Sequence, residues 1–516
     1  MLRPQSASAI FQRARFVVPA QHSTTAYYPN MTATEAPPMH QPPSSDRPAS
    51  DEVLRQQKPP PPAAGGAWFP MGYKEAAYQW WSSATPSISQ RRVIGLVPYL
   101  REATEAITKP ADVADPASDP YGTRVWRSSL VRLSGKDRAL NELSVERVGE
   151  ETEETVVMVH GYGAGLGFFY KNFEPITRIP GLKLYALDML GMGNSSRPHF
   201  KIHAKKREDQ VVEAESWFID ALEEWRQARK IERFTLVGHS LGGYLAVSYA
   251  LKYPGHLKKL ILASPVGIPE DPWAEKLPES TLQNEFVQDQ QSVTEGTADP
   301  RLAQPSSAAA SPAATPKRPI PSWAVWLWEA NVSPFSIVRL SGPFGPRVVS
   351  GWTSRRFNHL PTEEARVLHD YAFSIFKQKG SGEYALAYLL SPGAYARVPV
   401  INKVHRLGRG TYQGPDGQAR KETGLPVVFM YGEHDWMDEK GGYAAVKKLK
   451  QVQDQILETA TPEAKAAESG RARVVIIPNA GHHLYLDNAD AFNRVLRKEL
   501  EDVRDSEKKK KKLAAA

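Results

Sequence analysis

Three residues far apart in the sequence, Ser240, Asp435 and His482, are of the types that together carry out nucleophilic catalysis. Ser240 lies in GHSLG at 238–242, a G-x-S-x-G pattern between an apolar run and a stretch of helical character. A strand, sharp turn and helix in this order expose the serine hydroxyl, and the helix N-terminus favours negative charge beside it. The pattern therefore predicts a serine nucleophile.

A serine hydroxyl needs a base to accept its proton, and the base needs a carboxylate to orient it. His482 follows the apolar run at 474–477, and Asp435 follows the run at 426–431. Both are therefore expected at the same edge of a parallel sheet as Ser240, with His482 as the base and Asp435 as the acid.

Other ionisable residues stand close to this acid and base in the sequence. Asp438 competes with Asp435 for the role of the acid, whereas Glu433 lies too early in the turn. His434 and His483 are interpreted as structural residues.

The segment HGYGAG at 160–165 directly follows another apolar run, at 155–159. Backbone amides at this place and just after the nucleophile stabilise the oxyanion of acyl transfer, so Tyr162 and Leu241 are the expected donors. The segment lacks the Lys-Ser/Thr ending of a phosphate-binding loop. Asp188, in a later turn, is interpreted as a structural hydrogen-bond acceptor.

Short apolar runs rich in β-branched residues alternate with helical patterns along the chain. These runs lie at 155–159, 183–187, 234–238, 260–264, 426–431 and 474–477. The alternation predicts an α/β fold with a mostly parallel sheet and helices on both faces. The gap between 264 and 426 is too long for one crossover, and its tryptophans and phenylalanines predict an inserted cap.

The chain has 516 residues, no cysteine and a formal net charge of +8. The missing cysteine excludes disulfide frameworks, thiolate nucleophiles and Cys-based metal sites. Arginines in 1–34 and lysines at 508–512 account for the excess charge, so a nucleic-acid-binding domain is poorly supported. No apolar run reaches the length of about 18 residues that spans a bilayer.

The composition of the first residues, basic, serine-containing and without acids, predicts a mitochondrial transit peptide. An aromatic cluster follows the proline-rich stretch and predicts contact with a membrane surface, with packing on the catalytic domain as the alternative. The predicted segments are a transit peptide at 1–34, a disordered linker at 35–66, a membrane-contact segment at 67–120, a first core part at 121–265, a cap at 266–420 with a disordered tract at 288–320, a second core part at 421–505 and a basic tail at 506–516.

Several motifs together resemble one subfamily of the α/β-hydrolases, which includes lysophospholipid lipases, the comparative-gene-identification lipase coactivator and, most similar, a fungal mitochondrial cardiolipin-specific deacylase. The motifs are HGYGAG, LDMLGMGNSSRP, VGHSLGGYLAVSYALKYP, SPVGIPEDP, SGPFGP, GSGEYALAYLL, YGEHDWMD and NAGHHLYLDN. The resemblance implies an eight-stranded sheet and acyl-ester substrates. Carried over by position, it implies Ser240 as nucleophile, Asp435 as acid and His482 as base.

The resemblance leaves the reaction open. His482 and Asp487 form an H-x4-D pattern that this subfamily links to acyl transfer onto lysophosphatidic acid, although Asp487 could instead cap the last helix. We expect deacylation of cardiolipin to monolyso-cardiolipin, with no cofactor or metal. The alternatives are an acyl-CoA-dependent lysophosphatidic acid acyltransferase and a non-enzymatic lipase regulator. The expected partners are a phospholipid and an anionic membrane surface, at the periphery of the mitochondrial inner membrane.

Overall fold

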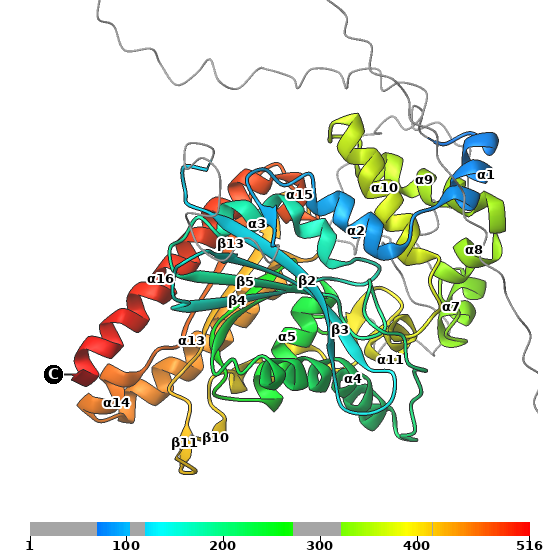
Figure 1. Cartoon of the computed structure of the whole chain (residues 1–516). Helices are drawn as coiled ribbons and strands as arrows, with labels where there is room; N and C mark the ends of the chain where they lie inside the picture. Colours follow the sequence, from blue (N-terminus) through cyan, green and yellow to red (C-terminus); the bar gives the residue numbers. More distant parts are fainter. Residues whose placement is uncertain (1–69, 104–118, 272–320, 415, 516) are drawn as a thin grey trace, which may run out of the picture. The chain divides into compact units, whose positions relative to one another are not determined.

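A mixed sheet of nine strands forms the centre of the described fold, in the order β1-β2-β3-β5-β4-β6-β7-β12-β13 (Figure 1). The strands are β1 (Arg101–Glu102), β2 (Arg124–Arg132), β3 (Ala139–Arg147), β4 (Glu154–Val159), β5 (Leu182–Leu187), β6 (Phe234–His239), β7 (Leu257–Ala263), β12 (Pro426–Gly432) and β13 (Arg471–Ile477). Neighbours are parallel from β5 to β13, and β3 is antiparallel to β2 and β5. The expected eight strands are present, and the two-residue β1 adds a ninth at one edge.

The computed structural model describes residues 70–103, 119–271, 321–414 and 416–515. They belong to one compact unit that spans Pro62–Ala516. The predicted transit peptide, the linker and the tract at 288–320 lie outside the described residues. No helix in the described part of the chain is both long and apolar enough to cross a membrane.

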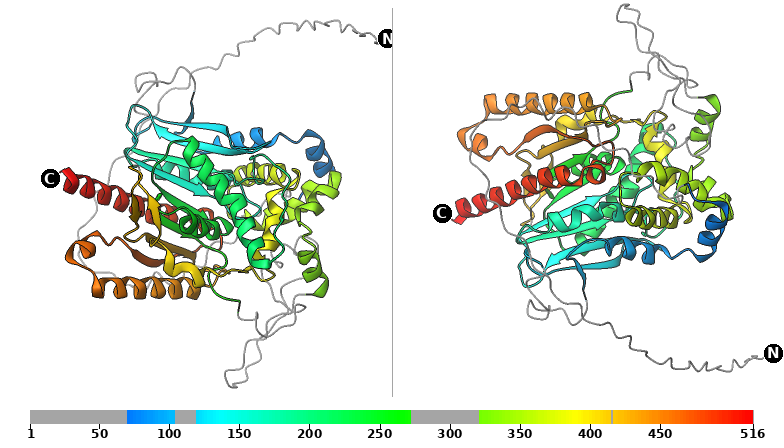
Figure 2. Two further views of the ribbon diagram at one scale, coloured as in Figure 1. Left: turned by 90° about the horizontal axis from the view of Figure 1, so that it is seen from below. Right: turned by 90° about the horizontal axis from the view of Figure 1, so that it is seen from above.

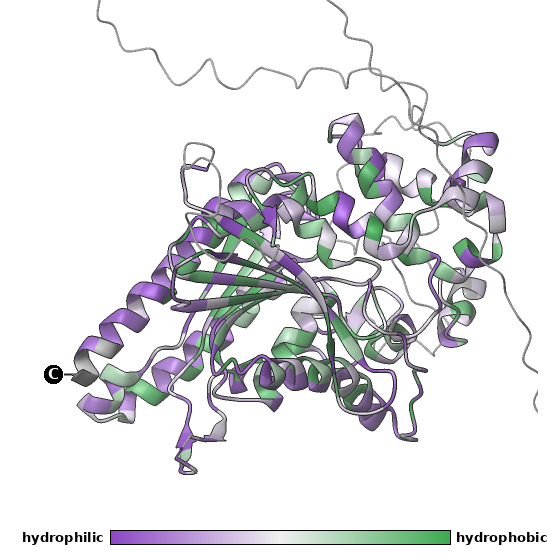
Figure 3. Ribbon diagram, in the orientation of Figure 1, coloured by the Kyte–Doolittle hydropathy of each residue, from purple (hydrophilic) through white to green (hydrophobic). Residues whose placement is uncertain are grey.

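Helices cover both faces of the sheet, as the alternating sequence pattern predicts. One face is covered by α4 (Arg207–Ala228), α5 (Leu241–Lys252) and α13 (Glu439–Thr459), and the other by α3 (Tyr170–Ile176), α15 (Leu484–Asp487) and α16 (Ala489–Ala515). The strands between these layers are mostly hydrophobic (Figure 3). Burial of this apolar surface stabilises the sheet and fixes the strand ends on which the candidate site is built.

The described residues between β7 and β12 are mainly helical, and they lie within the range expected for a cap. Their helices are α7 (Ser322–Glu329), α8 (Phe335–Leu340), η4 (Gly342–Phe344), α9 (Gly345–Arg356), α10 (Thr362–Phe376), η5 (Gly382–Ala385), α11 (Leu386–Leu389), α12 (Val400–Lys403) and η6 (Val404–Arg406). Two short hairpins also lie between β7 and β12, β8 (Leu390–Ser391) with β9 (Tyr395–Ala396) and β10 (Thr411–Gln413) with β11 (Ala419–Lys421). The second lies away from the cap helices, near the residues that precede β7 (Figure 1).

The N-terminal helices α1 (Tyr73–Ser82) and α2 (Pro86–Ile94) pack against the cap, α1 on α9 and α2 on α10. The Gln79 amide nitrogen donates to the Asp370 carboxylate at 2.6 Å, and the His369 Nε2 lies 3.0 Å from the Gln79 Oε1. This part of the predicted membrane-contact segment is therefore also a structural part of the cap.

The lysine run at 508–512 continues helix α16, which extends to Ala515. Lys508 pairs with Glu153 at 3.0 Å and Lys510 with Glu507 at 3.1 Å. The C-terminal end of α16 lies at the opposite end of the described unit from α1 and α8 (Figures 1 and 2). The lysines and the N-terminal aromatic residues therefore do not share one surface.

Candidate active site

Ser240 lies in the sharp turn between β6 and α5, with φ 53° and ψ −117°. The flanking backbone is tightly packed, because a Cβ at Gly238 would lie 2.5 Å from the Gly242 carbonyl oxygen and one at Gly242 would lie 2.5 Å from the His160 carbonyl oxygen. Side chains at these two positions would clash with backbone, so the glycines are required by space. They allow the strained turn that presents the Ser240 hydroxyl.

The structure places His482 and Asp435 beside Ser240 at the carboxyl ends of the parallel strands. The Nε2 of His482 lies 3.0 Å from the Ser240 Oγ, and its Nδ1 lies 3.2 Å from the Asp435 Oδ1. The imidazole can therefore accept the Ser240 proton at Nε2 while Nδ1 carries a proton toward the carboxylate.

Ser264, which directly follows β7, joins this group and was not among the predicted residues. Its hydroxyl donates to the Asp435 Oδ2 at 2.5 Å, and its Oγ lies 2.6 Å from the His482 Nδ1. The side chain is fully buried. In the sequence Ser264 is the last residue of an apolar run, and only the spatial meeting of β7 and β12 reveals its contacts.

The Asp435 carboxylate is surrounded by donors. Besides the contacts with His482 and Ser264, its Oδ1 accepts from the Met437 amide at 3.0 Å and its Oδ2 from the Gly432 amide at 3.4 Å. Burial alone would raise the pKa of Asp435, but the hydrogen bond and charge of His482, then Ser264 and the Met437 amide, hold that pKa below its ordinary value. The group is therefore ionised at neutral pH.

The competing acids have other contacts. The Asp438 carboxylate caps α13 by accepting from the Lys440 amide at 2.9 Å. Glu433 accepts from the Asn479 amide at 2.8 Å. The described contacts therefore place Asp435, and neither of these two, beside the imidazole.

Asp487 does not cap the terminal helix. The N-terminal capping contact of α16 comes from Asn488, whose Oδ1 accepts from the Ala491 amide at 3.1 Å. Asp487 instead accepts from the Gly481 amide at 3.0 Å, directly before His482. Its carboxylate therefore holds the loop that carries the base, which neither interpretation of the H-x4-D pattern foresaw.

The two expected oxyanion donors lie on either side of the nucleophile. Leu241 is the first residue of α5, and the turn that contains Tyr162 approaches Ser240 so closely that a Cβ on Gly161 would lie 2.9 Å from the Ser240 Cβ. The Tyr162 ring stacks on Phe335 of the cap helix α8, with ring centroids 5.4 Å apart. The turn is thus fixed between the sheet and the cap.

Buried polar groups support this turn from below. His160 donates from Nδ1 to the Gly161 carbonyl at 2.7 Å and accepts at Nε2 from the Met189 amide at 3.1 Å. Burial lowers the pKa of His160 and keeps it neutral. Asp188 accepts from the amides of Leu166 and Asn194, each at 2.7 Å, which agrees with its structural interpretation.

His239, the residue before the nucleophile, supports the base. Its Nε2 lies 3.0 Å from the His482 carbonyl oxygen, to which it donates. Burial and then the neighbouring His482 charge lower the pKa of His239 well below its ordinary value, so it stays neutral. The rings of Trp436 and His483 lie 4.8 Å and 5.4 Å from the His482 ring, centroid to centroid. His483 thus packs against the base.

An apolar cavity lies between the catalytic group and the cap. The cavity is partly open to solvent, and Ser240 and His482 lie in its wall. The apolar lining from the cap comprises Pro334, Phe335, Ile337, Val338, Val348, Val349, Trp352 and Phe376. Such an apolar lining beside the serine matches an acyl chain in polarity.

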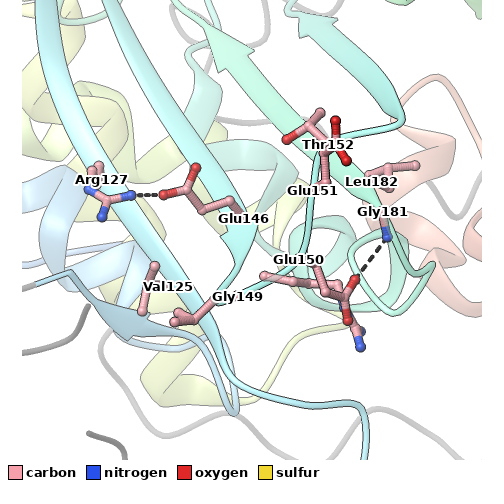
Figure 4. Close-up of a pocket in the computed structure, with 11 residues that line it drawn as sticks. Val125, Arg127, Glu146, Gly149, Glu150, Glu151, Thr152, Gly181 and Leu182 are labelled. Atoms are coloured by element: carbon pink, nitrogen blue, oxygen red, sulfur yellow. Dashed lines mark hydrogen bonds and ion pairs between the residues drawn. The ribbon is translucent and has the colours of Figure 1, made fainter. Parts of the chain in front are cut away.

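A second hollow lies beside the β2–β3 hairpin (Figure 4), but it lacks the groups for catalysis. Its charged side chains pair with one another, as Arg127 does with Glu146, and Glu150 accepts from the Gly181 amide at 2.9 Å. Neither serine nor histidine is among its lining residues.

Comparison with known proteins agrees with the fold described above. The family model of the α/β hydrolase fold matches residues 154–311. A 1-acylglycerol-3-phosphate O-acyltransferase of Arabidopsis thaliana is 30% identical over 426 residues, which cover 80% of this chain and 80% of that protein. The chain belongs to the α/β-hydrolase family.

Two further relatives fall in the lipid-acting part of the α/β-hydrolase family. The 1-acylglycerol-3-phosphate O-acyltransferase ABHD5 of Mus musculus is 26% identical, with 72% of this chain and 83% of that protein covered. The (lyso)-N-acylphosphatidylethanolamine lipase of Homo sapiens is 28% identical, with 67% and 79% covered. The expected α/β-hydrolase fold and subfamily are thus confirmed.

Proposed function

We propose that the chain is a serine hydrolase that removes an acyl chain from a phospholipid. The observation that carries this proposal is the 3.0 Å approach of the His482 Nε2 to the Ser240 Oγ in the wall of an apolar cavity. Lipase and acyltransferase activities of the relatives support the substrate class.

In this mechanism His482 takes the Ser240 proton as Oγ attacks the ester carbonyl. The amides of Tyr162 and Leu241 stabilise the oxyanion, and His482 then protonates the leaving alcohol. Water, activated by the same imidazole, attacks the acyl-enzyme and releases the fatty acid. Ionised Asp435 stabilises the imidazolium in both steps.

The substrate that we propose within this class is cardiolipin, converted to monolyso-cardiolipin. Support comes from the predicted import segment at 1–34, because cardiolipin is the anionic lipid typical of mitochondria. We place the protein at the periphery of the mitochondrial inner membrane. A fluorescent protein fused to residues 1–34 should accumulate in mitochondria, and a cytosolic signal would contradict this part of the proposal.

Acyl transfer onto lysophosphatidic acid is the second candidate, favoured by the activity in the names of two relatives. Water and a second alcohol would attack the same acyl-enzyme, so the catalytic group serves both reactions. Because Asp487 holds the Gly481 amide beside the base, Asp487→Ala is expected to slow both reactions and does not separate them. The acceptor must be varied instead.

The deciding experiment incubates purified protein with vesicles of cardiolipin, phosphatidylcholine, phosphatidylethanolamine or phosphatidylglycerol, and separately with lysophosphatidic acid and acyl-CoA. We expect fatty acid release, fastest from cardiolipin and absent in Ser240→Ala. Equal rates on all four lipids would contradict cardiolipin specificity. Phosphatidic acid formation without fatty acid release would establish the transferase. If the protein instead regulates a separate lipase without an activity of its own, Ser240→Ala would regulate that lipase as the wild type does.

We also propose that the cap end contacts the membrane. The exposed large apolar residues at this end come from α1, α7, α8 and η4 and are Tyr73, Tyr78, Trp80, Trp81, Trp323, Trp326, Ile337, Leu340 and Phe344. Ile337 also lines the cavity. Contact through this end would therefore bring the cavity close to the lipid from which an acyl chain must enter.

A further inference from the structure

Ser264 lies between the imidazole of His482 and the carboxylate of Asp435. The His482 Nδ1 has two oxygens within reach, the Ser264 Oγ at 2.6 Å and the Asp435 Oδ1 at 3.2 Å. The shorter distance is to the hydroxyl. That hydroxyl also lies 2.5 Å from the Asp435 Oδ2.

Only one arrangement of protons satisfies these contacts while Nε2 stays ready to accept from Ser240. Nδ1 then carries the imidazole proton and shares it between the Ser264 Oγ and the Asp435 Oδ1, and the Ser264 hydroxyl donates to the Asp435 Oδ2. Hydrogen bonds in such a chain polarise one another, and burial of Ser264 keeps water from competing. No bond at Ser264 breaks in this arrangement, so its proton stays on its oxygen throughout.

The backbone at Ser264 supports a role that goes beyond filling space. Its φ is 47°, a left-handed conformation that is unfavourable for most residues other than glycine. Its amide donates to the Met430 carbonyl of β12 at 2.7 Å, which fixes the turn against the strand that leads to Asp435. The strained turn therefore holds the hydroxyl between the carboxylate and the imidazole.

We propose that Ser264 is a fourth, positioning member of the catalytic group and relays the effect of Asp435 to His482. The inference rests on the proposed hydrolase and concerns how its base is oriented. It predicts that loss of the hydroxyl slows reaction at Ser240 without unfolding the protein.

The test compares Ser264→Gly and Ser264→Ala with the wild type. Glycine adopts the left-handed backbone without strain, so Ser264→Gly should keep the melting temperature of the wild type. Ser264→Ala removes only the hydroxyl and keeps the Cβ, which leaves less space for a water molecule to replace the hydroxyl. We expect labelling of Ser240 by a fluorophosphonate to slow by about 10- to 100-fold in Ser264→Ala, as for loss of a hydrogen bond to a charged group. The matched control is Ser374→Ala, which removes another buried hydroxyl, bonded to the Tyr371 carbonyl at 2.7 Å.

A second readout separates positioning from general structure. The proton on His482 Nδ1 is observed by proton NMR in protein with labelled histidine, and its resonance should shift in Ser264→Ala but not in Ser374→Ala. Folded Ser264 variants that label as fast as the wild type, with an unchanged resonance, would overturn the proposal. A wild type whose Ser240 reacts with no fluorophosphonate would instead contradict the hydrolase itself.

Discussion

Replacing Asp435 by asparagine should nearly abolish activity, although the side chain keeps its shape. The carboxylate oxygens accept from the Gly432 and Met437 amides and face Ser264 and His482. An amide NH2 in place of either oxygen would face a donor. The conflict is smallest when the NH2 group points toward Ser264. The Ser264 hydroxyl must then accept a hydrogen bond from this NH2 group and donate its own proton to the imidazole.

In that arrangement the His482 Nδ1 becomes an acceptor, so its proton moves to Nε2 and faces Ser240. The imidazole is then in the wrong tautomer to take the Ser240 proton. The corresponding change in serine proteases lowers kcat by about 10⁴-fold, or about 5 kcal/mol of barrier, and we expect a similar loss here.

The assay is kcat/KM on a fluorogenic fatty acyl ester for Asp435→Asn beside Asp438→Asn. Asparagine caps a helix as well as aspartate does, so the second variant should stay within about twofold of the wild type. Residual activity above about a tenth in Asp435→Asn, or a larger loss in Asp438→Asn, would refute the assignment of the acid.

Two other predictions concern the cap. Burial lowers the pKa of His369 from 6.5 to about 3, so the unfolded chain takes up a proton below pH 6.5 that the folded cap excludes. The free energy of unfolding should therefore fall by about 3 kcal/mol between pH 6.5 and about pH 4. Thermal unfolding of His369→Gln over the same pH range should show a smaller loss of stability. An equal loss in this variant would show that His369 is not the cause. Trp81 and Trp326 are 84% and 66% exposed, and joint replacement by alanine should weaken flotation with anionic vesicles by about tenfold. Lys510→Ala, at the opposite end of the described unit, should bind vesicles as the wild type does. Weaker binding by Lys510→Ala but not by the double tryptophan variant would place the membrane contact at the lysines.

The strands that carry the site could be predicted because each contains an apolar run, which is buried in β6 and β12 and partly buried in the edge strand β13. All six expected runs form strands, and the helix after Ser240 follows the elbow as predicted. The β2–β3 hairpin was missed because its pattern is mixed. Glu142 of β3, for example, is buried yet charged, and it pairs with Arg229.

The contacts inside the site were less predictable because they depend on turns. Ser264 reads as the end of a strand, and its link to His482 depends on a left-handed turn that sequence spacing does not reveal. Asp487 and Asn488 are adjacent and both suit a helix cap, but the last helix takes Asn488, and Asp487 is left to bind the Gly481 amide. The lysine run looked like a separate tail, yet lysine is a good helix former and α16 continues through it.

The stack of Phe335 on Tyr162 joins two parts of the protein that have different tasks. A Cβ on Gly163 would lie 2.8 Å from the Phe335 ring, so this one ring fills the space above the turn that carries an expected oxyanion donor. A bound molecule large enough to displace the Phe335 ring would also break its stack on Tyr162. That stack helps to hold the turn whose Tyr162 amide is an expected oxyanion donor. In the proposed hydrolase we therefore expect the size of the acyl chain and the rate of ester cleavage to be coupled through Phe335.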